Sequence, residues 1–247
     1  MGRKGDLKFI DLHTHILPGV DDGARDMAEA LEILRRARQD GTGTVVLTPH
    51  YRGRFRRNSV QHLRELFAQL SEAAAREVPD MALYLGHEAG NEHELSEKLL
   101  SGQVLTLMGT RYVLLEFDEY CYRSNVLSSI FDIVNSGFIP IIAHVERYEI
   151  FRKCANLAEE AVSMGAQLQI NAGSVLGCHG LGVKLYCGKL LRRKLVRFVA
   201  SDAHDAEKRP PTLGTCYDRI CRRYGETYAR ALFCENARKI LDEMEQV

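Results

Sequence analysis

The chain contains 247 residues, 45% of them hydrophobic, which suits one large α/β domain. Lys+Arg and Asp+Glu balance at 33 each, so no overall field attracts nucleic acid or an anionic membrane, and neither partner is expected. No apolar run approaches the ~18 residues of a membrane-spanning helix. The seven cysteines form no Cys-x-x-Cys pair, which argues against a disulfide framework or zinc ribbon and favours a reducing cytoplasm.

Along the chain, short runs rich in β-branched residues alternate with longer segments of helical periodicity, the pattern of βα units on a parallel sheet. The predicted strands are Phe9–Leu12, Thr44–Thr48, Ala82–Leu85, Tyr112–Glu116, Ile139–Ala143, Leu168–Asn171 and Arg197–Ser201. The predicted helices are Asp26–Asp40, Ser59–Glu77, Asn125–Ser136, Asn156–Met164, Thr212–Tyr224 and Glu226–Glu243. This order predicts a barrel or a doubly wound sheet, and both place their sites at the carboxyl ends of the strands.

Residues that ligate metals follow six of the seven predicted strands at that edge. His13 and His15 end the first strand, with Asp21 and Asp22 just beyond. The others are His50, Glu88, Glu116, His144, Asp202 and His204. His-x-His on an extended chain places both imidazoles on one side, so both can reach one ion. Because the set exceeds the needs of one ion, it predicts several ions bridged by a carboxylate, as in hydrolases that clamp a phosphoryl group.

The coincidence at six strand ends carries this prediction, since a single histidine at a strand end is usually a hydrogen-bonded structural residue. The remaining histidines lack such a context. His62, His93 and His179 are expected to be exposed, and His87 is expected to lie at most beside the ligands.

The same residues resemble the motifs of the PHP (polymerase and histidinol phosphatase) superfamily and, within it, the CpsB/YwqE-type bacterial tyrosine-protein phosphatases. The matching segments are 10–18 (IDLHTHILP), 21–23 (DDG), 48–50 (TPH), 115–117 (LEF), 143–148 (AHVERY) and 200–204 (ASDAH). The resemblance runs from about residue 9 to the end of the chain. It implies a distorted (β/α)7 TIM-like barrel, a single domain over residues 1–247, with the metal site at the C-terminal ends of the strands.

The resemblance also implies two to three metal ions, with Mn²⁺ favoured over Fe, Co, Mg or Zn. The family's motifs give three ligand groups, in which Glu88 is shared: His13, His15, Glu88 and Asp202; Glu88, Glu116 and His144; Asp22, His50 and His204. Glu116 is informative because many other members of the superfamily have a histidine there.

By this resemblance the chain is expected to be a metal-dependent phosphoric monoester hydrolase, a protein-tyrosine phosphatase of the non-cysteine type. Its expected substrate is phosphotyrosine on a bacterial tyrosine autokinase that controls capsule or exopolysaccharide synthesis. A metal-activated hydroxide would attack phosphorus. Arg147 and Arg209 match arginines of the family and would bind phosphate oxygens, because a guanidinium holds two at once. Either His50 or His204 would assist departure of the tyrosinate.

Other functions stay open on the sequence alone. The chain could be a phosphatase of a small molecule such as histidinol phosphate, a metal-dependent nuclease, or a non-catalytic regulator in which metal only stabilises the fold. A cysteine phosphatase is disfavoured. Cys187…Arg193 and Cys216…Arg222 have the required spacing but no glycine-rich cradle, and both lie in helix-like segments.

A basic loop, Tyr51–Asn58, directly follows His50. Neutralising Arg54, Arg56 and Arg57 together is expected to raise KM for phosphotyrosine peptides more than for a small aryl phosphate, because cations at the mouth of a site steer an acidic peptide. Steady-state kinetics on the two substrates checks this. Equal effects on both would remove the peptide-steering role.

Overall fold

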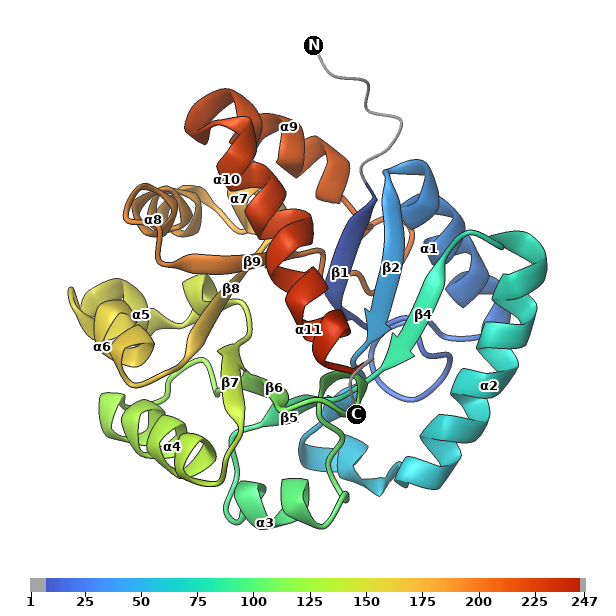
Figure 1. The fold of residues 1–247 in the computed structure, drawn as a ribbon, viewed down its shortest axis with the longest axis horizontal. Helices are drawn as coiled ribbons and strands as arrows, with labels where there is room; N and C mark the ends of the chain where they lie inside the picture. Colours follow the sequence, from blue (N-terminus) through green and yellow to red (C-terminus); the bar gives the residue numbers. More distant parts are fainter. Residues whose placement is uncertain (1–7, 245–247) are drawn as a thin grey trace.

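The computed structural model describes residues 8–244, and residues 1–7 and 245–247 lie outside that part. Within it the strands pair in parallel and form two sheets surrounded by helices (Figure 1). The first sheet has the order β1 (Phe9–Thr14), β2 (Thr42–Leu47), β4 (Ala82–Leu85). The second has the order β3 (His50–Tyr51), β5 (Glu88–Gly90), β6 (Tyr112–Glu116), β7 (Ile139–Ile142), β8 (Gln167–Asn171), β9 (Val196–Ala200).

The two sheets adjoin on both sides. On one side the chain passes from β2 to β3 through Thr48 and Pro49, and from β4 to β5 through Gly86 and His87, so two strands change sheet with hardly a break. On the other side backbone hydrogen bonds join the end of β1 to the segment after β9. His15 N–H donates to Ala203 O (2.8 Å), and Asp202 N–H donates to His13 O (3.0 Å). The carboxyl ends of both sheets therefore meet.

The helices flank the sheets, as βα order requires. They are α1 (Met27–Gln39), α2 (Val60–Glu77), α3 (Leu95–Leu100), α4 (Arg123–Asn135), α5 (Glu149–Lys153), α6 (Leu157–Ser163), α7 (Ala172–Leu176), α8 (Leu181–Arg192), α9 (Leu213–Tyr224), α10 (Glu226–Arg230) and α11 (Asn236–Met244). α1 begins where Asp26 Oδ1 accepts from Glu29 N–H (2.9 Å), and α2 where Ser59 Oγ accepts from His62 N–H (3.2 Å). No helix in residues 8–244 is long and apolar enough to cross a membrane.

The interior is apolar at one end and polar at the other. All residues of β1 and β2 are buried, as in parallel strands covered on both faces. An apolar cluster that includes Val46, Leu114 and Phe198 packs against Ile240 and Leu241 of α11. In Figure 1, α11 crosses the middle of the molecule beside β1 and β9. The polar end lies at the carboxyl ends of the strands.

All seven predicted strands are present, with bounds shifted by at most two residues. The short strands β3 and β5 were not predicted, because two or three residues carry no periodicity. Helices α3, α5 and α7 were also missed, and α8 was anticipated only around Cys187. The last predicted helix, Glu226–Glu243, is divided into α10, a π-helical turn (Ala231–Glu235) and α11.

Asp11 of β1 provides a further link between β1 and the segment after β9. Ser201 N–H donates to Asp11 Oδ1 at 3.0 Å. Burial raises the pKa of this carboxyl from 3.8 to about 6, although hydrogen bonds from Ser201 and His13 lower it. The pKa of Asp11 is therefore higher in the folded chain than in the unfolded one. Protonated Asp11 contributes fully to the free energy of unfolding below pH 4, and this contribution is lost as the pH rises through 6.

The variant Asp11→Asn keeps an oxygen acceptor for Ser201 N–H and removes this titration. Its free energy of unfolding is therefore expected to gain about 3 kcal/mol on that of the natural chain between pH 4 and pH 7. Urea unfolding of the metal-free protein across that pH range measures the difference. Asp132→Asn, on the exposed face of α4, is the matched control. Parallel pH profiles for Asp11→Asn and the natural chain would contradict the expectation.

Candidate metal centre

The nine predicted ligands come together at the carboxyl ends of the strands. Seven of them line one cavity of about 240 Å³: Asp22, His50, Glu88, Glu116, His144, Asp202 and His204. The other two, His13 and His15, are buried beside Glu88. Side chains from strands far apart in the sequence thus share one small space, as the strand-end pattern predicted.

Glu88 lies at the centre of the cluster and is 0% exposed. Its Oε2 atom lies 3.3 Å from His13 Nε2, 3.2 Å from His15 Nε2 and 3.0 Å from His50 Nδ1. Its Oε1 atom lies 2.8 Å from His144 Nε2. Although three ring nitrogens surround it, Oε2 forms no hydrogen bond of acceptable geometry. A buried carboxylate oxygen must be satisfied, and a divalent cation shared with imidazole nitrogens fits this donor set.

Three overlapping groups have ligand atoms within 4.8 Å of one another: His13, His15 and Glu88; His50, Glu88 and Glu116; His15, Asp22, His50 and His204. Asp202 Oδ1 adjoins the first group, 3.6 Å from His13 Nε2. His144 adjoins the second through Glu88, with its Nε2 atom 3.9 Å from Glu116 Oε1. These groups resemble the three expected ligand groups, except that His15 and His50 each belong to two groups and not to one.

The ligand-type rings are held in orientation by further polar side chains. His15 Nδ1 lies 2.7 Å from Asp21 Oδ2, and His13 Nδ1 lies 3.1 Å from Gln169 Oε1. Gln169 Nε2 donates to Asn171 Oδ1 (2.8 Å), and Asn171 Nδ2 donates to a carboxylate oxygen of Asp202 (2.6 Å). Such contacts fix the tautomer and direction of a metal-binding imidazole. Thus β8, the strand without a predicted ligand, supports the site indirectly.

Sequence reasoning missed Gln169 and Asn171 as functional residues. The signal was available, because polar residues at period two, Gln167, Gln169 and Asn171, alternate with Leu168 and Ile170 in this strand. Gln169 and Asn171 are buried, and buried amides need partners. Their side chains therefore had to face other polar groups.

Carboxylates dominate the electrostatics of the centre. Burial lowers the pKa of His15, but the Asp21 carboxylate outweighs burial and raises it to about 9. Burial likewise opposes protonation of His50, yet Glu88, Asp22 and Glu116 raise its pKa to about 12. Burial raises the pKa of Asp202, but the charges of His13 and Arg209 hold it below its ordinary value. The field that holds protons on these rings also favours metal cations, which must displace those protons to bind nitrogen.

The two predicted phosphate-binding arginines lie at the cavity wall and approach the same carboxylate oxygen. Arg209 Nη2 lies 2.7 Å and Arg147 Nη1 3.4 Å from Asp202 Oδ2. Their side chains are 35% and 41% exposed, so they remain accessible from the cavity. Arg152 Nη1 donates to the backbone oxygens of Glu146 (2.9 Å) and Arg147 (2.5 Å), which fixes the turn that carries Arg147.

The backbone is strained at two of the predicted ligands. His144 has φ of 30° and Asp202 has φ of 54°, in the left-handed region that residues other than glycine seldom adopt. Strain of this kind persists where surrounding structure enforces it, and it gathers at functional sites.

The basic loop forms a 3₁₀ turn, η1 (Gly53–Arg57). Arg52, just before it, lies 2.8 Å from Glu116 Oε2 and 2.8 Å from Asp118 Oδ1. Arg56 forms an ion pair with Glu92 (2.7 Å). Two cations of the loop are therefore partly neutralised, and Arg52 lines the cavity itself.

The remaining histidines lie outside the cluster. His62, His93 and His179 are exposed, as predicted. His87 is buried, and its Nδ1 atom accepts from Leu105 N–H (2.9 Å). Burial lowers its pKa to about 4, so the ring is neutral and pins the segment before β6.

The two cysteines of the rejected thiolate mechanism are buried. Cys187 lies in α8 and Cys216 in α9. Burial raises the pKa of both thiols, which opposes formation of a nucleophilic thiolate. Neither cysteine lines the cavity.

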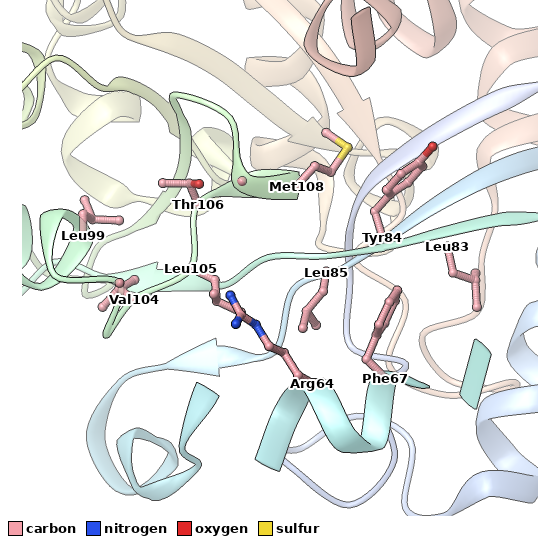
Figure 2. Close-up of a pocket in the computed structure, with 12 residues that line it drawn as sticks. Arg64, Phe67, Leu83, Tyr84, Leu85, Leu99, Val104, Leu105, Thr106 and Met108 are labelled. Carbon is pink, nitrogen blue, oxygen red and sulfur yellow. The ribbon is translucent and has the colours of Figure 1, made fainter. Parts of the chain in front are cut away.

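A second cavity, of about 420 Å³, lies between α2, β4 and the segment 99–109 (Figure 2). Phe67, Leu85 and Leu105 are among its apolar walls, and Arg64 reaches over it. Its described lining contains no His, Asp or Glu. Among residues 8–244, the groups whose ligand atoms lie within 4.8 Å of one another all belong to the cluster around Glu88.

Fold and site together define a class: an α/β protein with parallel sheets and a cluster of metal-ligand side chains at the strand ends. The family model of capsular polysaccharide synthesis, CpsB/CapC, matches residues 9–242. The chain belongs to this family.

Individual relatives match along most of their length. Tyrosine-protein phosphatase CpsB of Streptococcus pneumoniae is 33% identical over 238 residues, covering 94% of this chain and 98% of the relative. Tyrosine-protein phosphatase YwqE of Bacillus subtilis is 35% identical over 201 residues, covering 81% and 79%.

Solved structures agree in fold. One from crystallographic work on YwqE and CpsB, described as unique metal-dependent tyrosine phosphatases, superposes with a TM-score of 0.90 at 32% identity, covering 95% of this chain and 94% of the other. A lactonase from Listeria monocytogenes has a TM-score of 0.57 at 11% identity, a likeness of fold alone.

Proposed function

We propose that this chain is a metal-dependent protein-tyrosine phosphatase. The observation that carries the proposal is Glu88 Oε2, buried and without a hydrogen bond among three imidazole nitrogens. Arg147 and Arg209 stand at the wall of the same cavity. The family membership and the relatives named tyrosine-protein phosphatases support the choice of substrate.

The fold proposed for this enzyme is a distorted (β/α)7 barrel that forms one domain over residues 1–247. The barrel is supported by the two places where the chain passes from one sheet into the other, between β2 and β3 and between β4 and β5. If β2 with β3 and β4 with β5 each count as one strand, the nine strands of residues 8–244 become seven. The hydrogen bonds from β1 to Asp202 and Ala203 then join the last strand to the first.

The nine clustered residues would hold two to three ions, with Mn²⁺ proposed over Fe, Co, Mg or Zn. When bound, such ions supply activated water at neutral pH and neutralise phosphoryl charge. Glu88, with one oxygen facing three rings and the other facing His144, is suited to bridge two of them. Asp21 and Gln169 would keep the rings of His15 and His13 aimed at the ions.

The chain's own cations would bind the phosphate. Arg147 and Arg209 both approach Asp202, so a phosphoryl group entering the cavity meets two guanidinium groups that are already positioned. If only two ions are bound, whichever of His50 and His204 holds no metal would protonate the departing tyrosinate. Both line the cavity and lie 3.4 Å and 3.6 Å from Asp22, so each stays a candidate.

The substrate proposed is phosphotyrosine on a bacterial tyrosine autokinase that controls capsule or exopolysaccharide synthesis, with the cytoplasm as the compartment. The description of the family as one of capsular polysaccharide synthesis supports the link to capsule synthesis, and the spacing of the cysteines favours the cytoplasm. The cavity, at about 240 Å³, adjoins another of about 540 Å³ that shares Arg52, Glu116, His144 and Arg147 with it. The smaller cavity has room for the phosphorylated end of one side chain.

A substrate panel tests this function. Phosphotyrosine peptide, phosphoserine peptide, histidinol phosphate and a dinucleotide are each assayed by phosphate release or strand cleavage, with Mn²⁺ and with EDTA. We expect the phosphotyrosine peptide to be preferred, EDTA to abolish its hydrolysis and added Mn²⁺ to restore it. A thiol-alkylating reagent is the control and should leave the activity intact.

Each contrary result removes a different part of the proposal. A preference for histidinol phosphate or the dinucleotide would replace the substrate. Activity that survives EDTA would remove the metal mechanism. A metal-loaded chain that hydrolyses no phosphoester would favour a regulatory role.

A further inference from the structure

Phe55 differs from the other residues that line the metal cavity. Of the eleven lining residues, ten have ionisable side chains, and within the described chain Phe55 alone contributes a side chain made only of carbon and hydrogen. An aromatic ring in so charged a cavity needs a physical reason, because apolar groups gain free energy by leaving water for apolar surroundings.

Core packing does not supply that reason. Phe55 belongs to none of the described apolar clusters of buried residues, and the turn η1 buries none of its residues. The ring is only half-buried. Its side chain therefore contributes little to the stability of the fold.

The chain nevertheless holds the ring in a defined place. Phe55 N–H donates to Arg52 O (2.9 Å), and Asn58 N–H donates to Phe55 O (3.1 Å). Asn58 Nδ2 donates to Val20 O (2.7 Å), which ties the turn to the segment after β1. The ring stacks on the His50 imidazole, with centroids 5.7 Å apart and planes 14° apart, and the Arg54 guanidinium lies 4.8 Å from its centroid.

We infer that Phe55 contacts the aryl ring of the substrate and makes the site select aryl over alkyl phosphoesters. The inference rests on the proposed function. A phosphotyrosine side chain presents an anionic phosphate and a flat apolar ring. The phosphate meets Arg147 and Arg209, and the ring then needs an apolar wall, which only Phe55 offers among the described residues of this cavity. A phosphoserine side chain has no ring to place there.

The size of the effect follows from aromatic pairing. Contact between two aromatic rings changes an affinity by about two- to tenfold beyond the area it buries. Phe55 is thus a specificity-determining residue that acts on binding. Its loss should raise KM for aryl substrates far more than it lowers kcat.

The test compares two inert ligands, phenylphosphonate and methylphosphonate, on the full chain loaded with Mn²⁺. Calorimetry should show tighter binding of phenylphosphonate to the natural chain. In Phe55→Ala this advantage should fall by about two- to tenfold, with the Kd of methylphosphonate unchanged within about twofold. Phe55→Tyr should retain the advantage. Phe131→Ala, which removes an exposed phenylalanine of α4, is the matched control and should change neither affinity.

Two outcomes would overturn the inference. The phenyl advantage could persist in Phe55→Ala, or both phosphonates could weaken equally. The second result would mean that the ring acts through His50, and a lower Mn²⁺ content in Phe55→Ala would accompany it.

Turnover separates this inference from the proposed function. If the natural chain hydrolyses no phosphoester yet loses its phenyl preference in Phe55→Ala, the function fails and the aryl contact stands. If it hydrolyses phosphotyrosine peptide and Phe55→Ala keeps the phenyl preference, the function stands and the aryl contact fails.

Discussion

Burial of the Glu88 carboxylate is the constraint on which the rest of this structure depends. A carboxylate that is 0% exposed is costly unless cations or hydrogen bonds compensate it. No single strand can supply enough partners, so they come from the end of β1 and the residue after it, from β3 and from the segment after β7. The change of sheet at Gly86 and His87 makes this geometry possible, because it ends the pairing with β2 and places Glu88 opposite His50 and Leu114. The buried ring of His87 holds that crossover by accepting from Leu105 N–H.

The side chains around Glu88 are themselves held by further polar contacts. Asp21 and Gln169 orient the rings of His15 and His13, and Asn171 joins Gln169 to Asp202. Asp202 Oδ2, which accepts from Asn171, also contacts Arg147 and Arg209, so the predicted phosphate-binding arginines belong to the same network as the metal-ligand side chains. The left-handed backbone at Asp202 is the local cost of aiming its carboxylate at both. Removal of Asp21 or Gln169 therefore leaves a buried ring nitrogen, of His15 or His13, without its hydrogen-bond partner.

Sequence reasoning reached the strands and the predicted ligands because both follow from local rules. Parallel strands are apolar runs, their carboxyl ends share one edge, and a His, Asp or Glu just beyond each run must lie at that edge. The strands β3 and β5 and the contacts of Gln169 and Asn171 with the site were not predicted, since they depend on which strands become neighbours in the fold. The ion pair of Arg56 with Glu92 was hidden for the same reason. His87 was expected to lie at most beside the ligands, and its position next to Glu88 could not reveal that its ring accepts a hydrogen bond from the Leu105 backbone.

Anomalous diffraction from Mn²⁺-loaded crystals would show whether metal ions bind around the Glu88 carboxylate. We expect two or three manganese peaks among the nine clustered residues, with at least one in contact with Glu88 Oε2 and none in the apolar cavity of Figure 2. The matched crystal of Glu88→Gln should lose the peak at that oxygen, because a neutral amide is a poor substitute for a bridging carboxylate. Manganese bound elsewhere, or the same peaks in Glu88→Gln at full occupancy, would contradict this expectation.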